Sequence, residues 1–260
     1  MSRRISGFLI DIDGVLLSGG QRIDGALECI QFLNEQEIPF LLITNTTRQS
    51  RITIWHQLKR AWFPIRESDI YTAPLAAVSW LRNRKAQDIN LLISGSAVND
   101  FKEFKMTAYN PEYVVIGDIG RELSFDRLNS TFRLIMNGAK ILALQKNRYW
   151  QTEEGLTIDA GAVVAALEYA TRKRATIIGK PSRDFFLQAA RNLDLPPQEL
   201  VMVGDDIEAD VEGAQKAGMS GILVKTGKFR EEIFKASKVK PAAVIPSIAD
   251  LPKFINKALE

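Results

Sequence analysis

Short apolar runs alternate with stretches of helical spacing along this 260-residue chain. We predict strands from the runs, and helices where apolar residues recur at three- and four-residue intervals. The predicted strands cover residues 8–10, 39–44, 89–94, 113–117, 140–144, 175–179, 200–204, 221–224 and 242–245. The predicted helices cover residues 25–36, 49–61, 74–84, 124–137, 161–171, 182–193, 208–217 and 248–259. Strands that alternate with helices indicate an α/β fold with a doubly wound, mainly parallel sheet buried on both faces.

Polar residues stand at the ends of several predicted strands. The N-terminal apolar run "ISGFLIDIDGVLL", residues 5–17, is interrupted by Asp11 and Asp13. Ligands of a parallel α/β sheet bind beyond the carboxyl ends of its strands, so these positions are candidates for a site. One such residue could simply cap a helix, but four strand ends together favour a functional site. The other three ends carry "TNTT" at 44–47 (Thr44, Asn45), "GKPS" at 179–182 (Lys180) and "GDDIEAD" at 204–210 (Asp205, Asp206, Asp210).

Charge repulsion indicates what such a site would bind. Two carboxylates about 4 Å apart repel each other by roughly 4 kcal/mol at an effective dielectric constant near 20. Asp11, Asp13 and Asp205 could therefore share a cleft in ionised form only around a cation, and oxygen ligands suit Mg²⁺. With Lys180 as a second positive charge, the set forms a receptor for a phosphoryl group. A carboxylate oxygen not bound to the metal could attack phosphorus.

Composition excludes several other kinds of chemistry. The chain has 34 basic and 31 acidic residues without a dense basic block, so we expect no nucleic-acid partner. No apolar run approaches the roughly 18 residues of a membrane span, and Asp11 interrupts the first run. We therefore predict a soluble, cytoplasmic protein. Since His56 and Cys29 are the only residues of their types, multi-histidine metal sites and intrachain disulfides are excluded.

Several isolated residues in the predicted helices are expected to have no catalytic role. We expect His56 and Cys29 to be ordinary helix residues, because no basic group near Cys29 in the sequence would lower its pKa. Trp55, Trp62 and Trp80 are expected to pack their helices against the core.

The four strand-end motifs, in this order and at this spacing, resemble those of the haloacid dehalogenase superfamily in its aspartate-phosphatase branch. The glycine-rich "GVLLSGGQRIDGA" after the first motif resembles the squiggle and flap of that family. The long separation of the second and third motifs matches the insertion point of a large α/β cap of the second type, as in the NagD-like subfamily. The resemblance implies a Rossmann-like catalytic core of residues 1–72 and 178–260, and a smaller inserted cap domain of residues 73–177 that sets substrate specificity.

The resemblance also implies catalytic roles. Asp11 would be the nucleophile that forms an aspartyl-phosphate. Asp13 would protonate the leaving oxygen and then activate water, since the two halves of the reaction mirror each other. Lys180 would stabilise the transferring group, which Thr44 and Asn45 would hold. The expected phosphate-binding set is Asp11, Ile12, Asp13, Thr44, Asn45 and Lys180.

A metal set follows from the same resemblance. Mg²⁺ would be bound by Asp11, Asp205 and the backbone carbonyl of Asp13. Asp206 and Asp210 would orient metal-bound waters and Lys180. In the cap, the loop charges Asp118, Lys146 and Arg148 could contact a leaving group, although solvated surface charges are the simpler interpretation.

The predicted function is a Mg²⁺-dependent phosphatase acting on a small phosphorylated metabolite, which could be a phosphate monoester, a phosphoramidate or pyrophosphate. A phosphomutase or phosphotransferase with the same intermediate stays open, as does a catalytically weak family member that serves as a binding module. A phosphorylated signalling receiver is disfavoured by the Asp-x-Asp pair and the long insertion. We expect no membrane partner, and a homodimer is left open.

Overall fold

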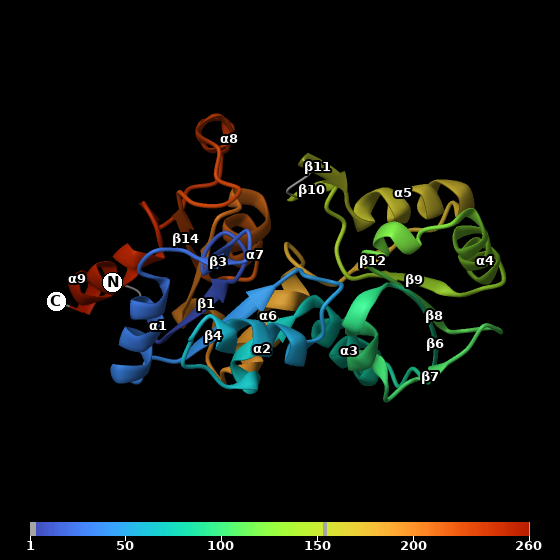
Figure 1. Ribbon diagram of the computed structural model, residues 1–260, viewed down its shortest axis with the longest axis horizontal. Coiled ribbons are helices and arrows are strands. Elements are labelled where there is room, and N and C mark those ends of the chain that lie inside the picture. Colours follow the sequence, from blue (N-terminus) through green and yellow to red (C-terminus); the bar gives the residue numbers. More distant parts are fainter. Residues whose placement is uncertain (1–3, 153–154, 260) are drawn as a thin grey trace. The chain divides into compact units, whose positions relative to one another are not determined.

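The computed structural model describes residues 4–152 and 155–259 (Figure 1). Each predicted strand and helix has a counterpart in it, and the predicted α/β fold with mainly parallel sheets is confirmed. Contacts divide the chain into two compact units, each with its own sheet. The first unit comprises residues 1–44, 55–71 and 180–260, and the second comprises residues 45–54 and 72–179.

A six-stranded sheet forms the centre of the first unit, in the order β15-β14-β13-β1-β4-β5. Every residue of β1, β4 and β13 is buried, which explains why these strands consist almost wholly of apolar residues. β1 pairs in parallel with both β13 and β4. The strands are β1 (Gly7–Asp11), β4 (Phe40–Thr44), β5 (Ile70–Thr72), β13 (Leu200–Gly204), β14 (Ser220–Val224) and β15 (Ala243–Ile245).

The order of connections in this sheet determines where a ligand can bind. From β1 the chain continues to β4 on one side, whereas from β13 it continues to β14 and β15 on the other. Crossovers between parallel strands are right-handed, so helices of the two halves cover opposite faces. The reversal of direction lies between β1 and β13, and a crevice for ligands forms at the carboxyl ends of strands at such a point.

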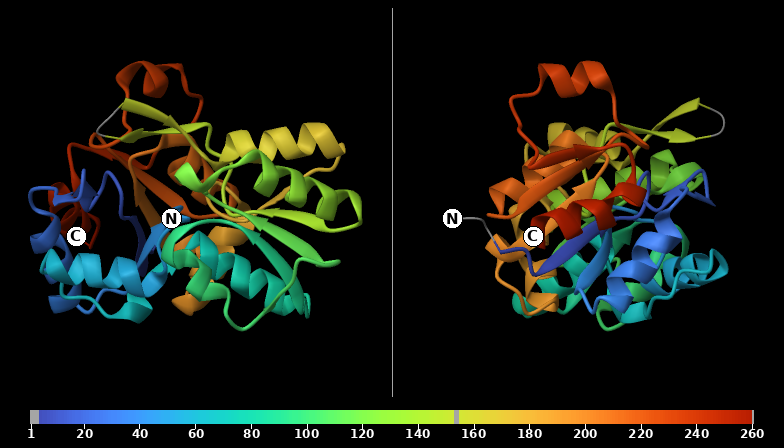
Figure 2. Two further views of the ribbon diagram at one scale, coloured as in Figure 1. Left: turned by 45° about the vertical axis from the view of Figure 1, so that its right-hand side comes forward. Right: turned by 90° about the vertical axis from the view of Figure 1, so that its left-hand side faces the viewer.

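Helices flank this sheet, and α8 stands apart from it in both views of Figure 2. α1 contacts α9, and α6 contacts α7. The helices are α1 (Ala26–Glu35), α2 (Arg51–Arg60, whose first turn belongs to the second unit), α6 (Arg183–Asn192), α7 (Gly213–Lys216), α8 (Glu231–Ala236) and α9 (Leu251–Leu259).

The second unit is built on a five-stranded parallel sheet in the order β12-β9-β8-β6-β7. α4 and α5 contact each other, and apolar residues of both pack with β8 and β9 in one core cluster. An antiparallel hairpin, β10–β11, completes the unit. The elements are α3 (Ala73–Asn83), β6 (Asp88–Leu92), β7 (Lys105–Met106), β8 (Tyr113–Ile116), α4 (Phe125–Met136), β9 (Lys140–Ala143), β10 (Tyr149–Thr152), β11 (Gly155–Ile158), α5 (Ala160–Thr171) and β12 (Thr176–Ile177).

Two details differ from the sequence-based predictions. The predicted helix over residues 208–217 begins as a π-helical segment, Ile207–Glu212, and only its end is α-helical. Trp62, predicted to pack against the core, is 78% exposed, because the chain leaves α2 there through a left-handed residue with φ of 68°. Trp80 is buried as predicted. The short strands β2 (Leu17–Ser18), β3 (Gln21–Arg22), β5 and β7, the hairpin β10–β11 and the helix α8 were not predicted.

Two predicted exclusions also concern the fold. Cys29 is fully buried in α1, and burial raises the pKa of its thiol to about 12, so it remains a neutral thiol at physiological pH. Its predicted role as an ordinary helix residue fits this environment. No helix within residues 4–152 and 155–259 combines the length and hydropathy needed to cross a membrane.

Candidate active site

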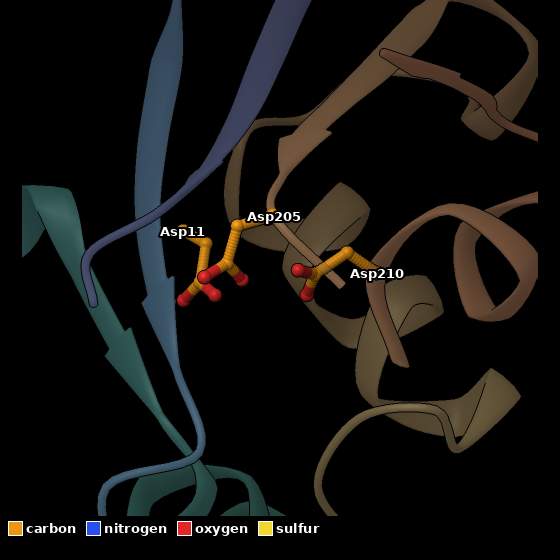
Figure 3. Close-up of side chains that lie close together, drawn as sticks. All are labelled: Asp11, Asp205 and Asp210. Carbon is orange, nitrogen blue, oxygen red and sulfur yellow. The ribbon is translucent and has the colours of Figure 1, made fainter. Parts of the chain in front are cut away.

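Three buried aspartates meet at the carboxyl edge of the first unit's sheet. Asp11 is the last residue of β1, Asp205 directly follows β13, and Asp210 lies in the π-helical segment behind it. Their carboxylates converge on one region in Figure 3. One oxygen from each lies within 4.8 Å of the others, and none of the three residues is more than 5% exposed. The reversal of strand order between β1 and β13 therefore brings together carboxylates that are about 200 positions apart in the sequence.

Lys180 joins this cluster as a buried cation. Its ammonium lies 2.8 Å from Asp11 Oδ1 and 2.7 Å from Asp210 Oδ1, and the residue is only 3% exposed. A buried charge is tolerated only with close partners of opposite sign, so the ammonium and the two carboxylates hold one another in position.

Both carboxylate oxygens of Asp210 have partners. Oδ1 faces Lys180, and Oδ2 accepts a hydrogen bond from the backbone N–H of Asp206 at 3.1 Å. Asp206 in turn accepts from the N–H groups of Glu208 and Ala209, at 3.0 and 2.9 Å, and thereby caps the π-helical segment. Asp210 thus orients Lys180, and Asp206 orients the backbone around Asp210.

Asp205 has one engaged and one unengaged oxygen. Oδ2 accepts a hydrogen bond from the backbone N–H of Lys228 at 2.7 Å. Oδ1 is buried without a hydrogen-bond partner among the described residues. A buried oxygen without a partner is costly unless a ligand fills the gap, so Asp205 can offer an oxygen to a ligand.

Two glycines allow the backbone to close around Asp205. A Cβ atom at Gly14 would lie 1.9 Å from Asp205 Oδ2, and one at Gly227 would lie 2.0 Å from the same oxygen. Thr226 donates its hydroxyl to the carbonyl of Gly14, which joins the two segments. The close approach of both backbones fixes Asp205 in one orientation.

The remaining predicted residues lie around this cluster or beside it in the chain. Asp13 is exposed, and its carboxylate accepts a hydrogen bond from the buried Thr44 hydroxyl at 3.4 Å. The N–H of Ile12 donates to Asp11 Oδ1 at 2.9 Å. Asn45 follows Thr44 but groups with the second unit, where its Oδ1 would lie 2.5 Å from a Cβ atom at Gly179.

The loop charges predicted for the cap have partners within the second unit. Lys146 forms an ion pair with Glu168 at 2.5 Å, and Asp118 accepts from the N–H of Gly120 at 2.8 Å. The guanidinium of Arg148 lies 5.7 Å from the ring centre of Tyr149. Lys146 and Asp118 are therefore paired within their unit rather than simply solvated, and contact of these residues with a leaving group stays a prediction.

Burial and mutual repulsion shift the acidic groups toward their protonated forms. The pKa of Asp205 is raised to about 8, mainly by burial and then by the charges of Asp11 and Asp210. Burial also raises the pKa of Asp210 to about 7 against the opposing effect of Lys180, and it raises the pKa of Asp11 in the same way. For Lys180, burial lowers the pKa, but Asp11 and Asp210 raise it further, so the group stays cationic.

These features fit a hard divalent cation. Carboxylate oxygens are the donors that such ions prefer, Asp205 lies in one cluster with Asp11, and its Oδ1 has no hydrogen-bond partner among the described residues. Because both oxygens of Asp210 are engaged, an ion would lie between Asp11 and Asp205, with Asp210 outside its direct ligands. The cluster therefore can hold a metal, and Asp11 and Asp205 are the side chains best placed to bind it.

The sequence analysis missed the loop at residues 226–228. Its backbone contacts Asp205 and Gly14, and Lys228 stands beside the cluster. This loop comes after the predicted strand at 221–224, so its position beyond a strand end is the same signal that marks the other candidate residues.

Comparison with known proteins agrees with this fold and shows the family of the chain. A family model described as haloacid dehalogenase-like hydrolase matches residues 8–106, and a second, described as HAD-hydrolase-like, matches residues 177–251. The chain belongs to the haloacid dehalogenase-like hydrolases and is an enzyme of that family.

Three known proteins illustrate the relationship. The chain is 38% identical to haloacid dehalogenase-like hydrolase domain-containing protein 2 of Bos taurus, over 92% of this chain and 91% of that protein. It is 34% identical to the human phospholysine phosphohistidine inorganic pyrophosphate phosphatase, over 95% of this chain and 92% of that protein. Its fold matches that of NagD from Escherichia coli K-12 with a TM-score of 0.88 at 24% identity, covering 95% of this chain and 98% of NagD.

The contact between Gly227 and Asp205 can be tested with a matched pair of alanine variants. Gly19 and Gly227 have nearly equal φ values, +56° and +58°, so both substitutions impose a left-handed strain of about 1–2 kcal/mol. A Cβ atom at Gly19 meets nothing within 4 Å, whereas one at Gly227 overlaps Asp205. Gly227→Ala should therefore lower the melting temperature clearly more than Gly19→Ala, in thermal unfolding followed by circular dichroism. Equal losses would contradict the close approach.

The raised pKa values predict how stability depends on pH without a metal. The folded protein holds protons on Asp205 and Asp210 up to about pH 8 and 7, whereas an unfolded chain releases them near 3.9. The folded state thus binds more protons in between, so the free energy of unfolding should fall as pH rises from about 4 to 8. Melting temperatures in a chelator should show this slope, and Asp205→Asn should flatten it. A slope that Asp205→Asn leaves unchanged would exclude Asp205 as its source.

Proposed function

We propose that this enzyme is a Mg²⁺-dependent phosphatase that hydrolyses a small phosphorylated metabolite through an aspartyl-phosphate on Asp11. The observation that carries the proposal is the cluster itself: the buried carboxylate of Asp11 is paired with the ammonium of Lys180, beside the unengaged oxygen of Asp205. The human relative, named a phosphatase of phospholysine, phosphohistidine and inorganic pyrophosphate, supports the same reaction class.

The proposed metal set is Asp11, Asp205 and the backbone carbonyl of Asp13. When bound, Mg²⁺ would offset the charge of the carboxylates and of the phosphoryl oxygens. Asp206 and Asp210 would act on this set indirectly, since Asp210 orients Lys180 and Asp206 caps the segment that carries Asp210.

The proposed first half of the reaction is a displacement at phosphorus. A carboxylate oxygen of Asp11 forms a bond to phosphorus while the bond from phosphorus to the leaving oxygen breaks. Asp13 gives its carboxyl proton to that leaving oxygen. Lys180, the hydroxyl of Thr44 and the N–H groups of Ile12 and Asn45 hold the phosphoryl oxygens.

The proposed second half returns the enzyme to its starting state. The carboxylate of Asp13 takes a proton from water as the water oxygen attacks phosphorus, and the bond between phosphorus and Asp11 breaks. Inorganic phosphate leaves, Asp11 is again a carboxylate, and Asp13 is again protonated. The exposure of Asp13 at the surface of its unit suits a group that must meet both a leaving oxygen and water.

We also propose that residues 73–177 form a cap that selects among small substrates, and that residues 1–72 and 178–260 form the catalytic core. A lid over the site would exclude water and strengthen the interactions of Lys180 with the phosphoryl group. The cytoplasm stays the predicted location, and a single buried cysteine suits its reducing conditions.

The nucleophile is tested by Asp11→Asn, which keeps the shape of the side chain and removes its charge. Turnover of p-nitrophenyl phosphate in Mg²⁺ should become undetectable, and Asp13→Asn should lower kcat by about 10²- to 10⁴-fold, the usual contribution of a general acid–base group. Asp194→Asn, an exposed position outside the site, serves as the matched control. Chelation should abolish the turnover of the wild type, and added Mg²⁺ should restore it. Turnover near the wild-type rate in Asp11→Asn would rule out the covalent route.

The cap is tested by replacing residues 73–177 with a short linker. The core should still hydrolyse p-nitrophenyl phosphate slowly, while discrimination among phosphorylated metabolites should collapse. The first turn of α2 needs attention in this design, because Ser50 and Thr53 hydrogen-bond to Ser96 in the excised segment. A folded core that discriminates among substrates as the intact protein does would exclude the cap as the source of specificity.

A further inference from the structure

The loop after β14, with the sequence "KTGKFR" at residues 225–230, is fixed to the catalytic cluster by its backbone. Thr226 donates its hydroxyl to the carbonyl of Gly14, and the N–H of Lys228 donates to Asp205 Oδ2 at 2.7 Å. Between them, the Cα atom of Gly14 would be only 2.6 Å from a Cβ atom at Gly227. The first half of the loop therefore cannot move without moving Asp205 or the turn after Asp11.

The second half of this loop is fixed as well. Phe229 packs against the buried residues Ile207, Val211 and Leu223, and its ring centre lies 6.0 Å from that of Phe234. Arg230 donates to the carbonyls of Gly227 and Phe229, at 3.1 and 2.7 Å. Lys228 is thus attached to a backbone that is held on both sides.

The side chain of Lys228, in contrast to its backbone, has no close partner. Lys228 is exposed and forms no ion pair within 4 Å with any residue of the described chain. Partial loss of solvent around its ammonium lowers its pKa, but the carboxyl groups of Asp11, Asp205, Asp206 and Asp210 raise it further, so the group is a cation near four carboxyl groups. Lys180 differs, because its ammonium is buried and already shared by Asp11 and Asp210.

We propose that Lys228 is a specificity-determining residue that binds a second anionic group of the substrate, a carboxylate or a further phosphate, outside the phosphoryl group that is transferred. This inference rests on the proposed phosphatase function and names the class of substrate: small molecules that carry two separate negative groups.

The position of Lys228 favours binding of a second anionic group of the substrate over binding of the phosphoryl group that is transferred. Lys180 and the backbone N–H groups of the first strand end lie in the buried part of the cluster, where the phosphoryl group must meet Asp11. Lys228 is reached from solvent and lies on the Asp205 side of the cluster, held there by its own backbone. The fixed backbone sets where the Lys228 side chain begins, so its ammonium can reach a leaving group on this side of the cluster without a rearrangement of the loop.

The test compares two inhibitors that differ by one charge. Propylphosphonate and 3-phosphonopropionate share the phosphonate and the chain length, but the second ends in a carboxylate. Inhibition constants against p-nitrophenyl phosphate turnover in Mg²⁺ are measured for the wild type, Lys228→Met, Lys228→Arg and Lys225→Met. Lys225 is the matched control, since it is an exposed lysine of the same loop, 3.9 Å from Glu231. Calorimetric titration of both ligands provides a readout that needs no turnover.

We expect the wild type to bind 3-phosphonopropionate about two- to fivefold more tightly than propylphosphonate, the range of a solvent-exposed ion pair. Lys228→Met should reduce this ratio to near one, while Lys228→Arg and Lys225→Met should preserve it. If Lys228 only balanced the charge of the carboxylate cluster, Lys228→Met would weaken the binding of both ligands equally. The ratio of the two inhibition constants would then stay unchanged in Lys228→Met, and this result would overturn the inference. So would a wild type that does not discriminate. Absence of turnover in the wild type would instead refute the proposed function, while calorimetry would still decide the role of Lys228.

Discussion

The buried ammonium of Lys180, held between Asp11 and Asp210, is the interaction on which the rest of the site depends. Each of the three groups would be costly to bury alone, and together they satisfy one another at 2.8 and 2.7 Å. Loss of any one member would leave an uncompensated charge in the interior, so the cluster constrains β1, the segment at Lys180 and the π-helical segment at once. The fold must bring together the end of β1, the segment at Lys180 and the π-helical segment behind β13, and the pairing of β1 with β13 accounts for the first and the third of these.

Much of this arrangement could be predicted from the sequence. Parallel strands buried on both faces are recognisable as apolar runs. Lys180 was selected at the end of a strand, β12, that belongs to the sheet of the second unit, so a shared sheet edge does not explain its position. Asp11, Thr44 and Asp205 were selected without coordinates by the rule that sites lie at the carboxyl ends of parallel strands. That rule works because strand polarity is shared across a parallel sheet, so residues that directly follow strands must meet at one edge.

The features that were not predicted from the sequence depend on backbone geometry, which side-chain types alone do not determine. Lys228 was missed because its loop binds Asp205 through a backbone N–H, which every residue but proline possesses. The π-helical segment could not be distinguished from an α-helix by its apolar spacing, and its geometry follows from the hydrogen bonds of Asp206 and Asp210. Trp62 was misplaced because one left-handed residue at the end of α2 redirects its side chain to solvent.

The different burial of Asp11 and Asp13 has a consequence for how protons would move in the proposed reaction. Only one residue separates the two, yet Asp11 is 5% exposed while Asp13 lies at the surface of its unit. The proposed nucleophile is thus shielded from water, whereas the proposed proton carrier is open to solvent. A proposed proton carrier that is open to solvent could pass protons to and from the outside without a relay through buried groups.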